Sequence, residues 1–342
     1  MHAKSAKKWL LICAKLAIVG LLVWAVRATL VKAFDELDKH TWHVQPLWLV
    51  VSGVLYILGT LPSAIYWQRL LVGAGQGVGL FETVRAYFVS QLGKYVPGKA
   101  MVLVLRAGLL YGARVSTSVL AASVFCETLT TMAAGSLLAT LILALWHQVQ
   151  VTLPIGGGVS VDLAIVALCM FLATGLPTLP PVMRLLVRVL GFSRINLSAV
   201  AQLSLAPYRT IALGWLMVAG GWILQGLSLW ATLRGLGILD TGPLVDLSLH
   251  TAAVALAVVA GFLALIPGGL GVRELVLIPL LSRYGDDKAL VSAIILRLVW
   301  LVAEVIVSTI LYPIKRRVGA LSPSRPAAEH DVDLTAGQQP VN

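Results

Sequence analysis

Six long apolar stretches dominate the pattern of hydrophobic and polar positions along the chain. They cover residues 9–31, 46–72, 118–146, 161–182, 211–233 and 290–312. Each has about 20 residues or more, which is the length that an α-helix needs to cross the hydrocarbon core of a bilayer. The pattern therefore predicts about six transmembrane helices, and the fold class is an all-α polytopic membrane protein.

Two further stretches are apolar but interrupted near their middle. Residues 80–113 are broken by Pro97-Gly98, and residues 249–284 are broken by Pro267-Gly268-Gly269. Proline and glycine end helices, because proline lacks an N–H donor and glycine leaves the backbone too free. We interpret both stretches as re-entrant hairpins, which enter the membrane, break at depth and return to the same side. The alternative is two ordinary spans joined by a turn at each break.

The composition excludes proteins that fold in water. Of the 342 residues, 58% are hydrophobic and 12% are charged, and the mean hydropathy is +0.90. A soluble domain has about 25% charged residues, so this chain has too little polar surface for a water-soluble enzyme. It is also too apolar for an intrinsically disordered protein.

The net charge of +11 indicates membrane orientation. With the N-terminus in the cytoplasm, 17 basic residues fall in inner segments and six in outer ones. Cytoplasmic loops are the ones that carry an excess of lysine and arginine. We therefore expect a multi-pass protein of the cell inner membrane with both termini cytoplasmic, and no nucleic-acid partner.

The broken stretches also indicate an internal repeat. Pro97 and Pro267 lie 170 positions apart, and 30 residues further on come Glu127 and Arg297. Each half then consists of a span, a broken hairpin and a span with a buried charge, and the two hairpins enter from opposite sides. Transporters with such an inverted repeat place their binding site between the halves, near the bilayer midplane.

The repeat divides the chain into a membrane domain and a tail. The membrane domain covers residues 1–314, and its halves cover about 46–146 and 211–314. Residues 315–342 are basic and then polar, which predicts a disordered cytoplasmic tail. Residues 183–208 carry arginines among leucines and valines, which favours either an amphipathic helix on the membrane surface or a cytoplasmic linker.

Charged residues inside predicted spans are the first candidates for function. Glu127 lies in the third span, and Arg297 and Glu304 lie on one face of the last, two helical turns apart. A charge at the centre of a spanning helix costs about 2.5–3.5 kcal/mol on insertion scales, so it needs an explanation. One explanation is a Glu127–Arg297 ion pair that joins the halves. The other is a polar cavity in which these charges bind or move a charged headgroup.

The two breaks supply the second set of candidates. At the first, Gly98 and Lys99 open a short helix whose free N–H groups suit a phosphate or another anion, and Lys94 and Arg106 add positive charge nearby. At the second, glycines allow the backbone to approach a ligand, and the next side chains carry one charge of each sign. These residues are Gly268, Gly269, Gly271, Arg273 and Glu274. Alternatively, the basic residues only set topology and the glycines only permit helix packing.

The sequence contains no motif for catalysis, nucleotide binding or metal binding. It has no GxSxG, Walker or HExxH pattern, and its six histidines lack ligand spacing. We therefore expect no enzymatic activity, no cofactor and no bound metal.

Five features of the sequence closely resemble the flippase-like family. They are the segment from Gly93 to Lys99 (GKYVPGK), Arg106, Glu127, the segment from Ile266 to Glu274 (IPGGLGVRE) and Arg297. That family is named after the transmembrane region of lysylphosphatidylglycerol synthases, and the resemblance covers nearly the whole chain. It implies a flippase fold that moves a polar or phosphate-bearing lipid between leaflets. The matched polar positions are Lys99, Arg106, Glu127, Arg273, Glu274 and Arg297. No soluble aminoacyl-transfer domain follows Pro313, so lysyl transfer is not implied.

We therefore expect a lipid transporter that works without ATP and whose partner is a membrane lipid with an anionic or phosphate headgroup. The alternative is a membrane-embedded enzyme or accessory subunit of lipid-linked glycan, polyprenyl-phosphate or hopanoid metabolism, with Glu274 as the catalytic candidate. A third possibility is a structural partner of a separately encoded lipid-modifying enzyme.

Overall fold

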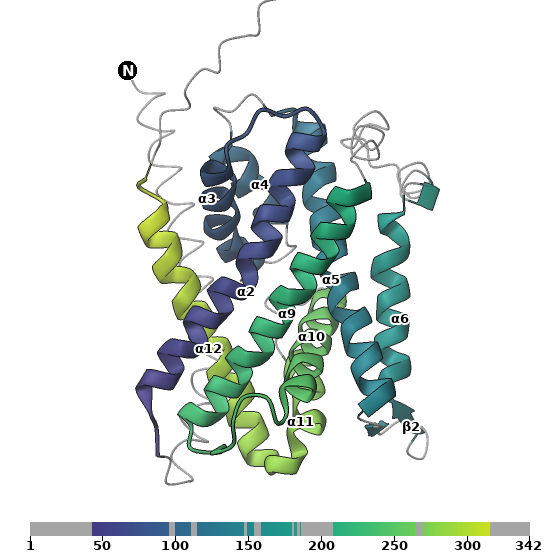
Figure 1. Cartoon of the computed structure of the whole chain (residues 1–342), viewed down its shortest axis with the longest axis vertical. Coiled ribbons are helices and arrows are strands. Elements are labelled where there is room, and N and C mark those ends of the chain that lie inside the picture. The colour runs from purple at the N-terminus through teal and green to yellow at the C-terminus, as the bar shows by residue number, and fades with distance from the viewer. Residues whose placement is uncertain are drawn as a thin grey trace, which may run out of the picture.

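The computed structural model shows a bundle dominated by long helices (Figure 1). It describes residues 43–95, 100–110, 115–146, 149–153, 159–179, 181–182, 185, 208–264, 269 and 271–314. Four helices in this part of the chain are long and apolar enough to cross a membrane. They are α2 (Pro46–Gly73), α5 (Thr117–Trp146), α9 (Tyr208–Gly235) and α12 (Asp286–Leu311). These helices confirm four of the six predicted spans by length and composition.

The predicted span at residues 161–182 is shorter than expected. The chain first forms an antiparallel hairpin of β1 (Gln150–Leu153) and β2 (Val159–Asp162). The Asp162 carboxylate then accepts a hydrogen bond from the backbone N–H of Ala164 at 2.8 Å and caps α6 (Leu163–Gly175). This helix has 13 residues, or about 20 Å, and it falls short of a hydrocarbon core of about 30 Å.

Other predicted segments lie outside the described residues. These are the first predicted span at 9–31, most of the surface helix or linker at 183–208, and the tail at 315–342. A short 3-10 helix, η3 (Leu176–Thr178), follows α6 directly.

The two halves share an order of α-helices, in which a long helix, two short helices and a second long helix follow one another. In the first, α2 is followed by α3 (Leu80–Gln91), η1 (Leu92–Tyr95), α4 (Ala100–Leu109) and α5. In the second, α9 is followed by α10 (Leu247–Leu263), α11 (Val272–Leu281), η5 (Ser282–Tyr284) and α12. Figure 1 shows α3 and α4 in the upper part of the bundle and α10 and α11 in the lower part, as an inverted repeat requires. The re-entrance of these short helices into a bilayer stays a prediction.

Small residues allow α2 and α9, the first long helices of the two halves, to cross in close contact. A Cβ atom added at Gly221 would lie 2.4 Å from the carbonyl oxygen of Gly59. Further along, the Ser52 hydroxyl lies 2.8 Å from the hydroxyls of both Ser228 and Thr232. Because lipid gives helices little hydrophobic reason to associate, close backbone approach and polar bridges of this kind hold the halves together.

We predict that Gly221→Ala destabilises the protein by about 1–3 kcal/mol, because the new methyl group must push α2 and α9 apart. Thermal unfolding in detergent, followed by circular dichroism, measures the effect. Gly220→Ala is the matched control, since a Cβ at Gly220 meets nothing within 4 Å and alanine favours a helix by about 1 kcal/mol. Equal unfolding temperatures for the two variants would contradict the close crossing.

Candidate functional site

Three ion pairs lie among the helices of the bundle in the described part of the chain. They join Arg106 to Glu127, Arg297 to Glu274, and Lys94 to Glu304. Each of these residues is a candidate from the sequence. The pairs differ in which parts of the fold they connect and in how fully their polar atoms are bonded.

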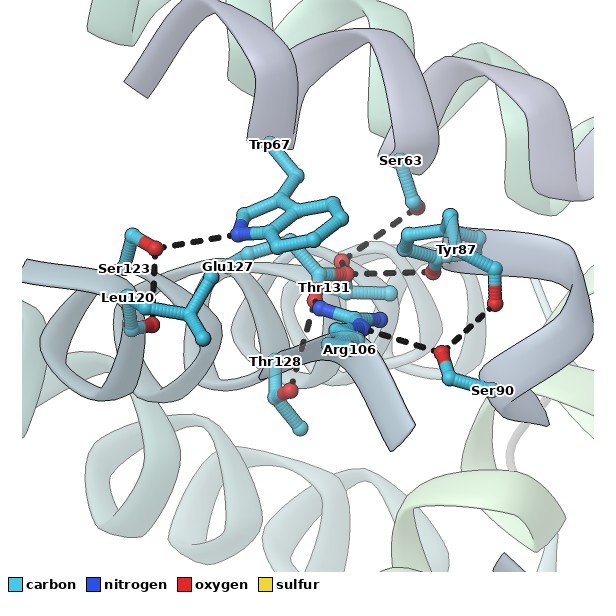
Figure 2. A network of polar contacts seen from close by, with 10 residues as sticks. All are labelled: Ser63, Trp67, Tyr87, Ser90, Arg106, Leu120, Ser123, Glu127, Thr128 and Thr131. Carbon is cyan, nitrogen blue, oxygen red and sulfur yellow. Dashed lines mark hydrogen bonds and ion pairs between the residues drawn. The ribbon is translucent and has the colours of Figure 1, made fainter. Parts of the chain in front are cut away.

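The Arg106–Glu127 pair is enclosed and fully bonded (Figure 2). The Arg106 guanidinium donates to the Glu127 carboxylate at 3.0 Å, and the two side chains are 2% and 3% exposed. Hydroxyls of Tyr87, Thr131 and Thr128 donate to the same carboxylate at 3.1, 3.3 and 3.4 Å. With donors on both oxygens, Glu127 has its capacity for hydrogen bonds largely filled.

Aromatic rings close the arginine side of this pair. The Arg106 guanidinium carbon lies 4.4 Å from the ring centroids of both Trp67 and Tyr87. Arg106 Nε also donates to the Ser90 hydroxyl at 3.2 Å. Such contacts stabilise a desolvated cation. The arrangement fixes the hairpin helix α4 against α5 and occupies the Arg106 guanidinium with contacts inside the protein.

The predicted Glu127–Arg297 ion pair is wrong. Glu127 binds Arg106 and Arg297 binds Glu274, so each of these two charges is neutralised by the hairpin of its own half. The physical reason is proximity, because α4 contacts α5 and α11 contacts α12, while the other hairpin helices, α3 and α10, also pack on the long helices α12 and α5 of the opposite half. The two halves use the same design with the charges exchanged, since the hairpin supplies the cation in the first half and the anion in the second.

The Lys94–Glu304 pair is the one described bundle ion pair that connects the halves. Lys94 lies in η1 at the tip of the first hairpin, and Glu304 lies in α12 of the second half. Tyr56 of α2 donates its hydroxyl to the same carboxylate oxygen, and Lys94 Nζ lies 3.2 Å from that hydroxyl. The Tyr56 ring is itself held by stacking on Trp300, with centroids 4.3 Å apart.

Arg273 from the second hairpin completes what we call the central cluster, which consists of Lys94, Arg273, Glu274, Arg297 and Glu304. The charges of Arg273 and Arg297 both act on Lys94, and Arg273 also acts on Glu304. The Nε atom of Arg273 is buried without a hydrogen-bond partner in the described structure, and so are the Oε2 atoms of Glu274 and Glu304. Polar atoms left open in this way are where a ligand can bind.

The central cluster is also more accessible than the Arg106–Glu127 pair. The side chain of Lys94 is 23% exposed, and those of Arg297 and Glu274 are 11% and 14% exposed. Within the described residues, no group of histidine, cysteine and acidic side chains is arranged to hold a metal ion. The chemistry that this cluster offers is therefore ionic and hydrogen-bonding.

A family model, the lysylphosphatidylglycerol synthase TM region, matches residues 12–309 of the chain. The chain belongs to this family. No curated protein matches it. Membership and the apolar helices together make the chain a membrane protein. The transport activity that the family resemblance implies stays a prediction for this family member.

Two glycines of the second break allow a backbone conformation that other residues rarely adopt. Gly269 and Gly271 have φ angles of 69° and 82°, which side chains other than glycine rarely adopt. A Cβ at Gly269 would lie 2.9 Å from the Cα atom of Gly261 in α10 and 3.0 Å from Arg273 Nε. Gly269 therefore packs closely on Gly261 of α10, with the Arg273 side chain beside both glycines. Gly98, Lys99 and Gly268 lie outside the described residues.

Some residues of these networks carry no clear signal in the sequence. Tyr56, Tyr87 and Trp67 are aromatic residues in apolar stretches, and their roles depend on which charge the fold brings beside them. A polar residue repeated within an otherwise apolar span is the signal that could have pointed to Ser90 and Thr131.

A separate polar group lies in the second half of the chain, beside the start of α12. Arg283 donates to Asp246 at 2.8 Å, and Tyr284 donates its hydroxyl to the same carboxylate at 3.0 Å. Burial and the nearby Asp246 charge raise the pKa of Tyr284 above its ordinary value. This group fastens η5 to the start of α10 and lies apart from the central cluster.

We predict that Arg106→Met destabilises the protein by about 3–5 kcal/mol, because it leaves the Glu127 carboxylate buried without its cation. The double variant Arg106→Met/Glu127→Leu should be more stable than Arg106→Met alone, since an apolar pair replaces a lone charge. Unfolding temperatures of both single variants and the double variant complete the cycle. Additive losses would show that the two side chains are not coupled.

Proposed function

We propose that this protein exchanges a lipid with a negatively charged phosphate headgroup between the two leaflets of the cell inner membrane. The headgroup binds Arg273 in the central cluster while the acyl chains stay in the bilayer. The process uses neither ATP nor a catalytic step. The observation that carries this proposal is the partly buried side chain of Arg273, whose Nε atom is buried and has no partner among the described residues although two carboxylates lie in the same cluster.

The charge of the central cluster supports an anionic ligand. Its described members supply three cations and two carboxylates, which leaves an excess of one positive charge. Uncompensated charge inside a membrane protein is costly. A phosphodiester headgroup with a single negative charge neutralises the cluster, and its oxygens accept hydrogen bonds from a guanidinium.

The position of the cluster supports movement between leaflets. It collects charges from η1 at the tip of the first hairpin and from α11 after the break of the second. In Figure 1 the two hairpins belong to opposite ends of the bundle. A site shared by two oppositely directed hairpins can open to either side, which is the basis of alternating access in transporters with inverted repeats.

The orientation in the membrane is part of the proposal. The excess of basic residues in the predicted inner segments favours cytoplasmic termini. The hairpin that contains α3 and α4 then enters from the cytoplasm, and the hairpin that contains α10 and α11 enters from the outside.

We predict that the purified protein in phosphatidylcholine vesicles speeds the exchange of a trace of fluorescent phosphatidylglycerol, and speeds that of fluorescent phosphatidylcholine much less. A membrane-impermeant reductant, which quenches only the outer leaflet, measures the exchange. Arg273→Gln should slow the anionic lipid about tenfold or more, corresponding to about 1.4 kcal/mol of lost interaction.

Arg283→Gln is the matched control, because Arg283 is more than half exposed and pairs with Asp246 away from the cluster. It should leave the rate unchanged. Exchange no faster than in protein-free vesicles would refute transport and would favour the role of a partner for a separate enzyme. Equal rates for both lipids, or for Arg273→Gln and the unaltered protein, would refute the anion site.

A further inference from the structure

We propose that Glu304 binds a proton when the two halves separate with a headgroup bound, so that the anionic lipid and a proton move together in the same direction. This inference rests on the proposed function, and it adds the energy source that the proposed function lacks.

The first observation is where the partners of Glu304 come from. Its carboxylate receives hydrogen bonds from Lys94 in η1 and from Tyr56 in α2, and both belong to the first half, whereas Glu304 belongs to the second. Any movement that separates the halves at this point removes both donors at once. Glu127 differs, because Arg106, Tyr87 and its other donors all lie in its own half and move with it.

The second observation is that one oxygen of Glu304 has no hydrogen-bond donor among the described residues. Its side chain is 1% exposed, both donors bind Oε1, and Oε2 is buried without a partner in the described part of the chain. A carboxylate that loses its cation inside a membrane must find another cation or take up a proton, because an isolated buried charge is strongly unfavourable.

Several titratable or charged side chains of the described structure face Glu304, either as its partners or as candidates to replace them. They are Tyr56 from α2, Lys94 and Tyr95 from η1, Arg273 from α11, and Arg297 on α12 itself. Arg297 is engaged by Glu274. Arg273 therefore remains as the replacement cation within the second half, and it is also the residue that holds the headgroup.

The balance of charge then decides when a proton is needed. Without a headgroup, the second half contributes Arg273 and Arg297 against Glu274 and Glu304, so the set is neutral after Lys94 leaves. With an anionic headgroup on Arg273, the same set has three negative groups and two positive ones. One proton on the carboxylate of Glu304 restores neutrality, and it is released when Lys94 returns. One proton thus accompanies each negative charge.

The test uses the phosphatidylglycerol exchange assay with a pH gradient across the vesicle membrane. The fluorescent lipid should accumulate in the leaflet that faces the alkaline side, and a protonophore should abolish the accumulation. Glu304→Gln imitates the protonated carboxyl, so whatever exchange this variant supports, fast or slow, should distribute the lipid evenly despite the gradient. Asp287→Asn, an exposed acid on the same helix, is the control and should keep the accumulation.

Infrared spectroscopy provides a readout that does not depend on transport. Addition of phosphatidylglycerol to the protein in phosphatidylcholine at constant pH should produce a carbonyl stretch that shifts in D2O, as that of a protonated carboxyl does and those of lipid esters do not, and Glu304→Gln should lack this band. Exchange that runs but ignores the gradient in the unaltered protein would overturn the proton inference and leave the proposed function intact. A band that persists in Glu304→Gln would assign the proton to another residue. Absence of any exchange would overturn the proposed function and this inference with it.

Discussion

An ionic side chain inside a membrane protein must be neutralised by a partner within reach, and this requirement organises the structure. Each half meets it by laying a short hairpin helix against the long helix that follows. Arg106 of α4 neutralises Glu127 of α5, and Glu274 of α11 neutralises Arg297 of α12. Each half therefore contains an internal ion pair, and the signs of the hairpin residue and the long-helix residue are exchanged between the halves. A third pair, Lys94 with Glu304, then connects the halves.

These pairs differ in what they allow. Glu127 receives four donors from its own half and is enclosed by the aromatic rings beside Arg106, which is typical of a structural contact. Glu304 receives its donors from the opposite half and keeps one oxygen free of partners in the described structure. A contact of the first kind survives relative motion of the halves, whereas one of the second kind is broken by it. We therefore assign the proposed binding and movement to the central cluster, and a structural role to the Arg106 network.

The sequence predicts the long helices α2, α5, α9 and α12 because about 20 consecutive apolar residues have few other stable arrangements in a bilayer. It also predicts that the charged residues within them matter, because such charges are costly. It does not predict their partners, since any of several cations can satisfy Glu127 and only the packing of α4 on α5 selects Arg106. Nor does it predict the hairpin of β1 and β2, of which only residues 161 and 162 fall within a predicted span. The contribution of Tyr56 depends entirely on the position of α12 beside α2.

The most direct test of the account is native mass spectrometry of the lipid that remains bound to the purified protein. If the excess positive charge of the central cluster is a headgroup site, the unaltered protein carries a phospholipid with a net negative headgroup charge. Arg273→Gln loses this lipid and Arg283→Gln retains it. Retention of the same anionic lipid by Arg273→Gln, or recovery of neutral lipids alone from the unaltered protein, would contradict the assignment.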